Sequence, residues 1–117
     1  MDVLDALFRR PFNNDLFPFA ENKIPGTING VNFDYGNLGT AFYDVTPSNN
    51  GAGSYNNGWI YRNDGVDIVN ENGTPYVGWT KKGEWLQYTI SVPESGLYNI
   101  EINTSANNKS SLELEIN

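Results

Sequence analysis

The chain has 117 residues and a formal charge of −7 at pH 7, which disfavours nucleic acid and anionic membranes as partners because both would repel it. It contains no histidine and no cysteine, so a Ser-His-Asp triad, a disulfide and a thiolate metal site are excluded. Twelve glycines, six prolines and 14% aromatic residues favour an all-β fold of short strands joined by turns.

The N-terminal stretch differs from the rest of the chain. Residues 3–8 are compatible with a short helix that Pro11 ends, and residues 12–23 are irregular and rich in aromatic and Asn residues. We therefore expect residues 1–23 to be a linker or arm from a preceding domain, and residues 24–117 to form one β-domain.

Short extended segments separated by turns make up the first half of that domain. The predicted strands are 27–33, 40–44, 65–69 and 76–79. A turn is predicted at 70–75. Residues 47–58 form a long polar loop, for which a functional loop and plain disorder remain open.

The strongest period-two pattern runs from residue 86 to residue 102. Its apolar members are Leu86, Tyr88, Ile90 and Val92 before a turn at 93–96, and Tyr98, Ile100 and Ile102 after it. This alternation predicts two antiparallel strands that each bury one face. A similar alternation at 112–116 predicts a further strand.

Three carboxylates stand among apolar or aromatic residues and are therefore candidates for catalysis. They are Asp44, Asp67 and Glu84, where burial raises a carboxyl pKa toward the range of a general acid. The favoured interpretation of Asp67 and Glu84 is structural, as hydrogen-bond acceptors at strand ends.

Aromatic residues point to a different chemistry. Sugar rings stack on Trp and Tyr while their hydroxyls seek carboxylates, amides and Arg, and Tyr61 and Arg62 follow the long polar loop in that combination. The alternative is that Trp59 and Tyr61 cover the edge of the core. Trp79 and Trp85 are expected to be packing residues.

A succession of short motifs resembles one known family. The pieces, in order, are Ile24-Pro25-Gly26-Thr27-Ile28, Asn32-Phe33-Asp34, Ala41-Phe42-Tyr43-Asp44-Val45-Thr46-Pro47, Asn49-Asn50-Gly51, Tyr61-Arg62, Gly65-Val66-Asp67-Ile68, Tyr76-Val77-Gly78-Trp79-Thr80 and Gly83-Glu84-Trp85-Leu86-Gln87-Tyr88-Thr89. From residue 24 to residue 117 the chain resembles family-six carbohydrate-binding modules.

The resemblance implies both a fold and a function. The fold is a jelly-roll β-sandwich, and the function is binding of β-linked polysaccharide such as xylan or β-glucan without cleaving it. The module is usually attached to a secreted bacterial glycoside hydrolase. Tyr61 resembles the family's stacking Tyr and Asp44 its acidic partner, and we expect Arg62 and Tyr43 to contribute to the same ligand site.

Two departures from the family pattern affect these expectations. Asn29, Gly30 and Val31 stand where the family usually has Glu-Ala-Glu at a structural calcium site, so calcium is doubtful because Val cannot ligate a metal. The cluster at 63–67 offers oxygen ligands but does not match an EF-hand loop. The family also continues beyond the strand at 112–116, so we expect the sandwich to lack its C-terminal strands.

Two alternatives from other functional classes remain open at this point. One is a small polysaccharide-cleaving enzyme that uses Asp44 or Glu84 as its acid or base. The other is a purely structural or protein-contacting β-domain.

Overall fold

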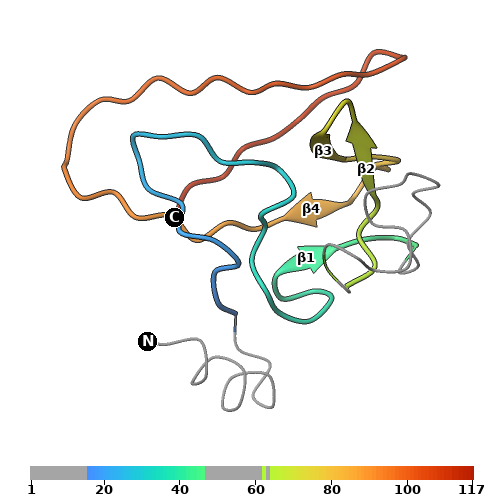
Figure 1. The fold of residues 1–117 in the computed structure, drawn as a ribbon, viewed down its shortest axis with the longest axis horizontal. Coiled ribbons are helices and arrows are strands. Elements are labelled where there is room, and N and C mark those ends of the chain that lie inside the picture. Colours follow the sequence, from blue (N-terminus) through green and yellow to red (C-terminus); the bar gives the residue numbers. More distant parts are fainter. Residues whose placement is uncertain (1–15, 47–61, 63) are drawn as a thin grey trace.

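The computed structural model describes residues 16–46, 62 and 64–117. Within these residues it contains no helix and four short strands, β1 (Phe42–Tyr43), β2 (Ile68–Glu71), β3 (Thr74–Val77) and β4 (Trp85–Leu86). The strands form two antiparallel pairs, β1 with β4 and β2 with β3 (Figure 1). The predicted all-β class is confirmed at this level.

The pair β2–β3 is a tight hairpin. Glu71 lies opposite Thr74, which leaves Asn72 and Gly73 as a two-residue turn with φ values of 53° and 86°. Positive φ at both central residues suits the right-handed twist of a hairpin, and Asn-Gly is the pair that adopts it most readily. A turn does lie within the predicted range 70–75, but it is shorter than predicted, because residues 70–71 and 74–75 belong to β2 and β3.

The pair β1–β4 joins segments that are far apart in the sequence. Phe42 lies opposite Leu86 and Tyr43 opposite Trp85. The pairing extends past the strand ends, because Gln87 N donates to Ala41 O at 3.0 Å. A third segment joins here, since Asp34 N donates to Gln87 O at 2.8 Å. The predicted extended segment at 40–44 thus contains β1.

The core lies beneath the inner face of β1 and β4. Its buried members are Phe33, Ala41, Phe42 and Val66, with Leu16, Val77, Leu86 and Tyr88 packed against them. The rings of Phe33 and Phe42 meet edge to face with their centroids 5.5 Å apart, a geometry that aromatic pairs favour.

Residues 16–23 contact the unit that the sequence predicts to begin at Ile24. Phe17 and Tyr35 exchange two backbone hydrogen bonds, at 3.2 and 2.8 Å, and their rings lie 5.2 Å apart. Further along, Ser91 N donates to Asn22 O at 2.8 Å. This segment therefore contributes to the packing of the unit.

The predicted strand at 27–33 is wrong. Asn32 N donates to Asn29 O at 2.9 Å, which closes a turn, and Asn29 Oδ1 accepts from Val31 N at 3.3 Å. An Asn side chain that bonds to the nearby backbone competes with a strand ladder, and here this local turn takes its place.

The predicted antiparallel pair of 86–92 with 98–102 does not form either. Strand β4 covers only Trp85–Leu86, and within the described chain no backbone hydrogen bond joins residues 92–117 to another segment. These residues run out past the sheets and fold back as extended chain without strands (Figure 1). The alternation specifies which side chains share a face, but it does not supply a partner strand; 112–116 likewise forms no strand.

Candidate functional site

Two aromatic side chains share the outer face of the β1–β4 pair. Tyr43 and Trp85 are directly opposite each other, and each leaves 41% of its surface exposed. Opposite residues of an antiparallel pair project to the same face with Cβ atoms about 4.5–5.5 Å apart. The two side chains therefore start from neighbouring positions on one accessible face of the pair.

The inner neighbours of these two rings fix their orientation. Phe42 is buried and Leu86 packs on the core. Because successive side chains along a strand alternate between faces, burial of Phe42 and Leu86 places Tyr43 and Trp85 outward. A shift of the register by one residue would put both rings in the core and the core residues in water.

Glu84 links the two strands at this end of the pair. Its Oε1 accepts from Val45 N at 3.3 Å and its Oε2 accepts from Lys81 N at 2.8 Å. One carboxylate thus ties the turn before β4 to the chain after β1. The structural interpretation of Glu84 is confirmed.

Asp44 closes the end of β1. It is buried, and its Oδ1 accepts hydrogen bonds from Thr46 N at 2.7 Å and Thr46 Oγ1 at 3.2 Å. This is an Asx turn, in which the side chain bonds to the backbone two residues ahead. Asp44 therefore shapes the backbone directly after Tyr43 and immediately before residues 47–61, which lie outside the described chain.

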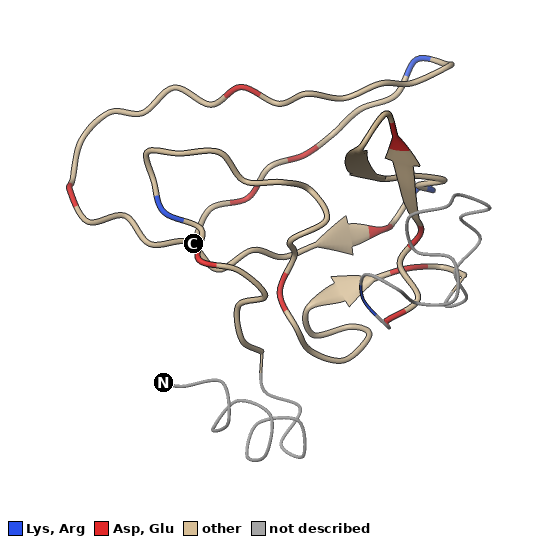
Figure 2. Cartoon of the chain, in the orientation of Figure 1, with Lys and Arg blue, Asp and Glu red and all other residues tan. Residues whose placement is uncertain are grey.

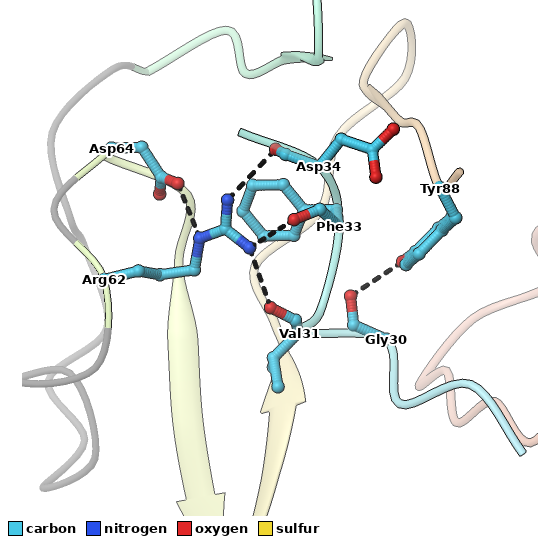
Figure 3. Close-up of polar contacts among 7 residues, drawn as sticks. All are labelled: Gly30, Val31, Phe33, Asp34, Arg62, Asp64 and Tyr88. Atoms are coloured by element: carbon cyan, nitrogen blue, oxygen red, sulfur yellow. Dashed lines mark hydrogen bonds and ion pairs between the residues drawn. The ribbon is translucent and has the colours of Figure 1, made fainter. Parts of the chain in front are cut away.

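Arg62, expected to contact ligand, lies in the interior with 4% of its surface exposed. Its Nη1 donates to Val31 O at 3.1 Å and to Phe33 O at 2.5 Å, and its Nη2 donates to Asp34 O at 3.1 Å (Figure 3). Its Nε donates to Asp64 Oδ2 at 2.6 Å. This side chain holds residues 31–34 against the segment that begins β2.

Asp64 is the counterion of this buried cation. Burial raises the pKa of its carboxyl above the ordinary value, while the charge of Arg62 and their hydrogen bond act in the opposite direction. Its Oδ1 is buried and has no hydrogen-bond partner. Asp64 therefore serves chiefly to neutralise the buried charge of Arg62 and to accept its Nε–H, rather than to add stability of its own.

Asp34 and Tyr88 tie residues 30–34 to the chain after β4. The Asp34 carboxylate accepts from Thr89 N at 2.9 Å and from Thr89 Oγ1 at 2.6 Å, and the Tyr88 hydroxyl donates to Gly30 O at 2.7 Å. Burial, together with the nearby negative charge of Asp34, raises the pKa of Tyr88 to about 12, although Arg62 opposes the shift.

The region of the doubtful calcium site is occupied by packing and local hydrogen bonds. The Val31 side chain is buried, and the Asn29 side-chain oxygen is used by the turn described above. Among the described residues no group of three carboxylate side chains is placed to hold a metal ion. Residue 63, part of the second predicted cluster, lies outside the described residues.

The structure brings together only part of the predicted ligand site. Tyr43 is exposed at the end of β1 and Asp44 beside it is buried, whereas Arg62 donates hydrogen bonds in the interior to residues 31, 33, 34 and 64. Tyr61 and Trp59 lie outside the described residues, as does the whole polar loop at 47–58.

The prediction that Trp79 and Trp85 are packing residues is wrong. They leave 49% and 41% of their surfaces exposed, respectively. For Trp85 the sequence held the signal, because an alternation that buries Leu86 puts its neighbour on the opposite face. Trp79 has a backbone φ of 50°, which takes it out of the strand conformation after β3, so a period-two pattern does not predict the face on which its side chain lies.

Comparison with known proteins adds no assignment. Neither a scan of protein-family models nor a search of curated proteins found a match. Within the described residues no helix has the length and apolar character needed to cross a membrane. Acidic residues are scattered along the described chain (Figure 2).

Proposed function

We propose that this chain is a non-catalytic module that binds β-linked polysaccharide such as xylan or β-glucan. The observation that carries the proposal is the exposure of large aromatic side chains on the strands. Tyr43, Tyr76 and Trp85 each leave between 41% and 45% of their surface accessible. Burying such a side chain in the core would gain roughly 1.5–3 kcal/mol, so rings left at the surface are available for a ligand.

The chemistry of a neutral glycan fits this surface. Pyranose rings present flat C–H faces that stack on Tyr and Trp, and their hydroxyls pair with fixed polar groups at the rim. The net charge of −7 does not hinder an uncharged polymer, whereas it would weaken binding to a polyanion. Tyr43 is the expected contact that the structure shows exposed, whereas Asp44 beside it is buried and shapes the backbone after it; Tyr61 remains an expected contact.

The finer fold and the biological role belong to the same proposal. The two antiparallel pairs are parts of a jelly-roll β-sandwich, as the resemblance to family-six carbohydrate-binding modules implies. The module would be covalently attached to a catalytic domain in a secreted glycoside hydrolase. Binding an insoluble polymer raises the effective concentration of that enzyme at its substrate.

The enzymatic alternative receives less support from the site. Both oxygens of Glu84 accept backbone hydrogen bonds, and Asp44 Oδ1 is engaged in its own turn. A general acid or base must be free to exchange its proton with the substrate. These carboxylates instead hold the strand ends.

Affinity electrophoresis in gels containing xylan, β-1,3-glucan, cellulose or agarose tests the proposal, with calorimetry on the soluble polymers as the quantitative measurement. We expect at least one polymer to retard the protein, and the retardation to persist in high salt because stacking on a neutral sugar is not screened. A non-binding protein of similar size and charge is the control. Retardation by none of the four polymers would contradict the proposal, and release of reducing ends that disappears in Glu84→Gln would favour the enzyme.

A further inference from the structure

The outer face of the β1–β4 pair carries a site that the sequence does not predict, because it adds Trp85 to Tyr43. These two residues are opposite partners in the ladder and are equally exposed, at 41% each. Two exposed rings on one face present more apolar area than one pyranose covers. Such a surface suits consecutive sugars of a chain rather than one isolated sugar.

The surroundings fix the backbone that carries both rings before any ligand arrives. Glu84, directly before Trp85, is bonded to Val45 N and Lys81 N, and Asp44, directly after Tyr43, is bonded to Thr46. Phe42 and Leu86 anchor the opposite face. A platform already fixed by its neighbours loses little conformational entropy on binding.

The net charge of the chain, −7, disfavours acidic sugars as ligands. Close to the two rings in the sequence the charges balance, with Asp44 and Glu84 against Lys81 and Lys82. An uncharged ring with equatorial hydroxyls presents the flat C–H face that aromatic side chains stack against.

We infer that Tyr43 and Trp85 form a two-ring stacking platform for at least two consecutive residues of a neutral, linear β-glycan. This inference rests on the proposed function and names the surface and the ligand length. It assigns Trp85 direct contact with the sugar, and it makes the two rings act together.

Calorimetry with the full chain tests the platform, using as ligands xylohexaose and cellohexaose, the monomers xylose and glucose, and polygalacturonate. The variants are Tyr43→Ala, Trp85→Ala, their combination and Trp85→Tyr, with Trp79→Ala as the matched control because Trp79 is also exposed but is not paired with Tyr43. Circular dichroism and thermal unfolding show which variants are folded.

We expect each single Ala variant of the pair to weaken hexaose binding about ten-fold or more, since a stacked ring contributes on the order of one decade of affinity. The double variant should lose less than the product of the two single losses, because each ring needs the other. Trp85→Tyr should retain most of the affinity and Trp79→Ala should bind like the wild type. Monomers and polygalacturonate should bind far more weakly than the hexaoses.

Several outcomes would overturn the inference. If the chain binds polysaccharide and a folded Trp85→Ala variant binds the hexaoses as tightly as the wild type, the platform is wrong while the proposed function stands. Loss of binding in a folded Trp85→Tyr variant as large as in Trp85→Ala would likewise contradict stacking on a ring at this position. If monomers bind as tightly as hexaoses, the claim of two consecutive sugars is wrong, and tighter binding of polygalacturonate would overturn the claim of a neutral ligand. If the wild type binds none of the polymers and hexaoses, both proposals fail together.

Discussion

The guanidinium carbon of Arg62 lies 3.4 Å from the centroid of the Phe33 ring. It also lies 4.4 Å from the centroid of the Phe19 ring. The same guanidinium group donates hydrogen bonds to the backbone carbonyls of residues 31, 33 and 34. One side chain therefore provides the hydrogen bonds that a neighbouring strand would otherwise provide to an irregular buried segment.

Replacing Arg62 should strongly destabilise the fold. Arg62→Met leaves several buried carbonyls and the Asp64 carboxylate without their donor, so we expect the free energy of unfolding to fall by roughly 3–5 kcal/mol. Arg62→Lys should lose most of the same amount because an ammonium group cannot reproduce the planar fork of donors. Urea denaturation followed by circular dichroism measures both.

The control for Arg62 is Lys82→Met, which removes a cation from an exposed turn. Its effect should stay within about 0.5 kcal/mol. An Arg62→Met variant as stable as this control would show that the buried network is not needed for folding.

The hydrogen bonds between Asp34 and Thr89 should contribute less to the free energy of unfolding than Arg62 does. The contributions of the two side chains should depend on each other. Thr89→Val removes the hydroxyl donor and Asp34→Asn replaces one acceptor oxygen by an amide, so each change should lower the free energy of unfolding by about 1–3 kcal/mol. A double-mutant cycle should give a non-zero coupling energy because the two side chains touch. Strictly additive losses would mean that the hydroxyl bond contributes nothing.

Sequence reasoning succeeds here where the structure depends on local chemistry. Asn72-Gly73 specifies its own turn through positive φ, and the hairpin follows from it. Pairing of β1 with β4 is different, because alternation fixes the face of each strand but not which distant strand lies beside it. For that reason the predicted partner of the chain after Leu86 was the next segment, whereas the structure pairs Leu86 with Phe42.

The candidate site likewise contains features that the local sequence predicts and features that depend on long-range packing. The sequence predicts Tyr43 as a ligand contact, and Tyr43 is exposed. The sequence prediction of a packing role for Trp85 is wrong, because the alternation that buries Leu86 places Trp85 on the opposite face. The sequence also predicts Arg62 as a ligand contact, because a cation beside aromatic residues suits a sugar site. The same combination suits a buried cation stacked on rings, and sequence alone does not distinguish the two.

Tyr88 should make the stability of the fold sensitive to alkaline pH. Its pKa is raised to about 12 from the usual value of 10, so the folded state holds the phenol proton more tightly than the unfolded state does. The stabilisation is complete below pH 10 and is lost as the pH rises from 10 toward 12. Because Tyr88 is partly exposed, we expect a loss of about 1–2 kcal/mol rather than the full value of the shift.

The variant Tyr88→Phe isolates this effect from the titration of the lysines and the other tyrosines. At pH 8 it should be less stable than the wild type by about 1 kcal/mol, because it lacks the hydrogen bond to Gly30 O. The difference in the free energy of unfolding between the two proteins should shrink and then reverse as the pH approaches 12. A difference independent of pH would show that the Tyr88 hydroxyl has the same proton affinity in both states.

Substitutions at two glycines distinguish the effect of backbone conformation on stability from the effect of steric space. A Cβ atom added at Gly73 or at Gly96 would meet no heavy atom within 4 Å, but only Gly73 has a left-handed φ, of 86°. Gly73→Ala should therefore lower the free energy of unfolding by about 1–2 kcal/mol, the cost of placing a side chain in that conformation. Gly96→Ala should be neutral or stabilising by up to about 1 kcal/mol, because it restricts the unfolded chain without straining the folded one. The hydrogen bond from the amide of residue 73 to Asn70 Oδ1 is available in both variants, so equal denaturation midpoints would mean that the turn conformation does not limit the stability of the hairpin.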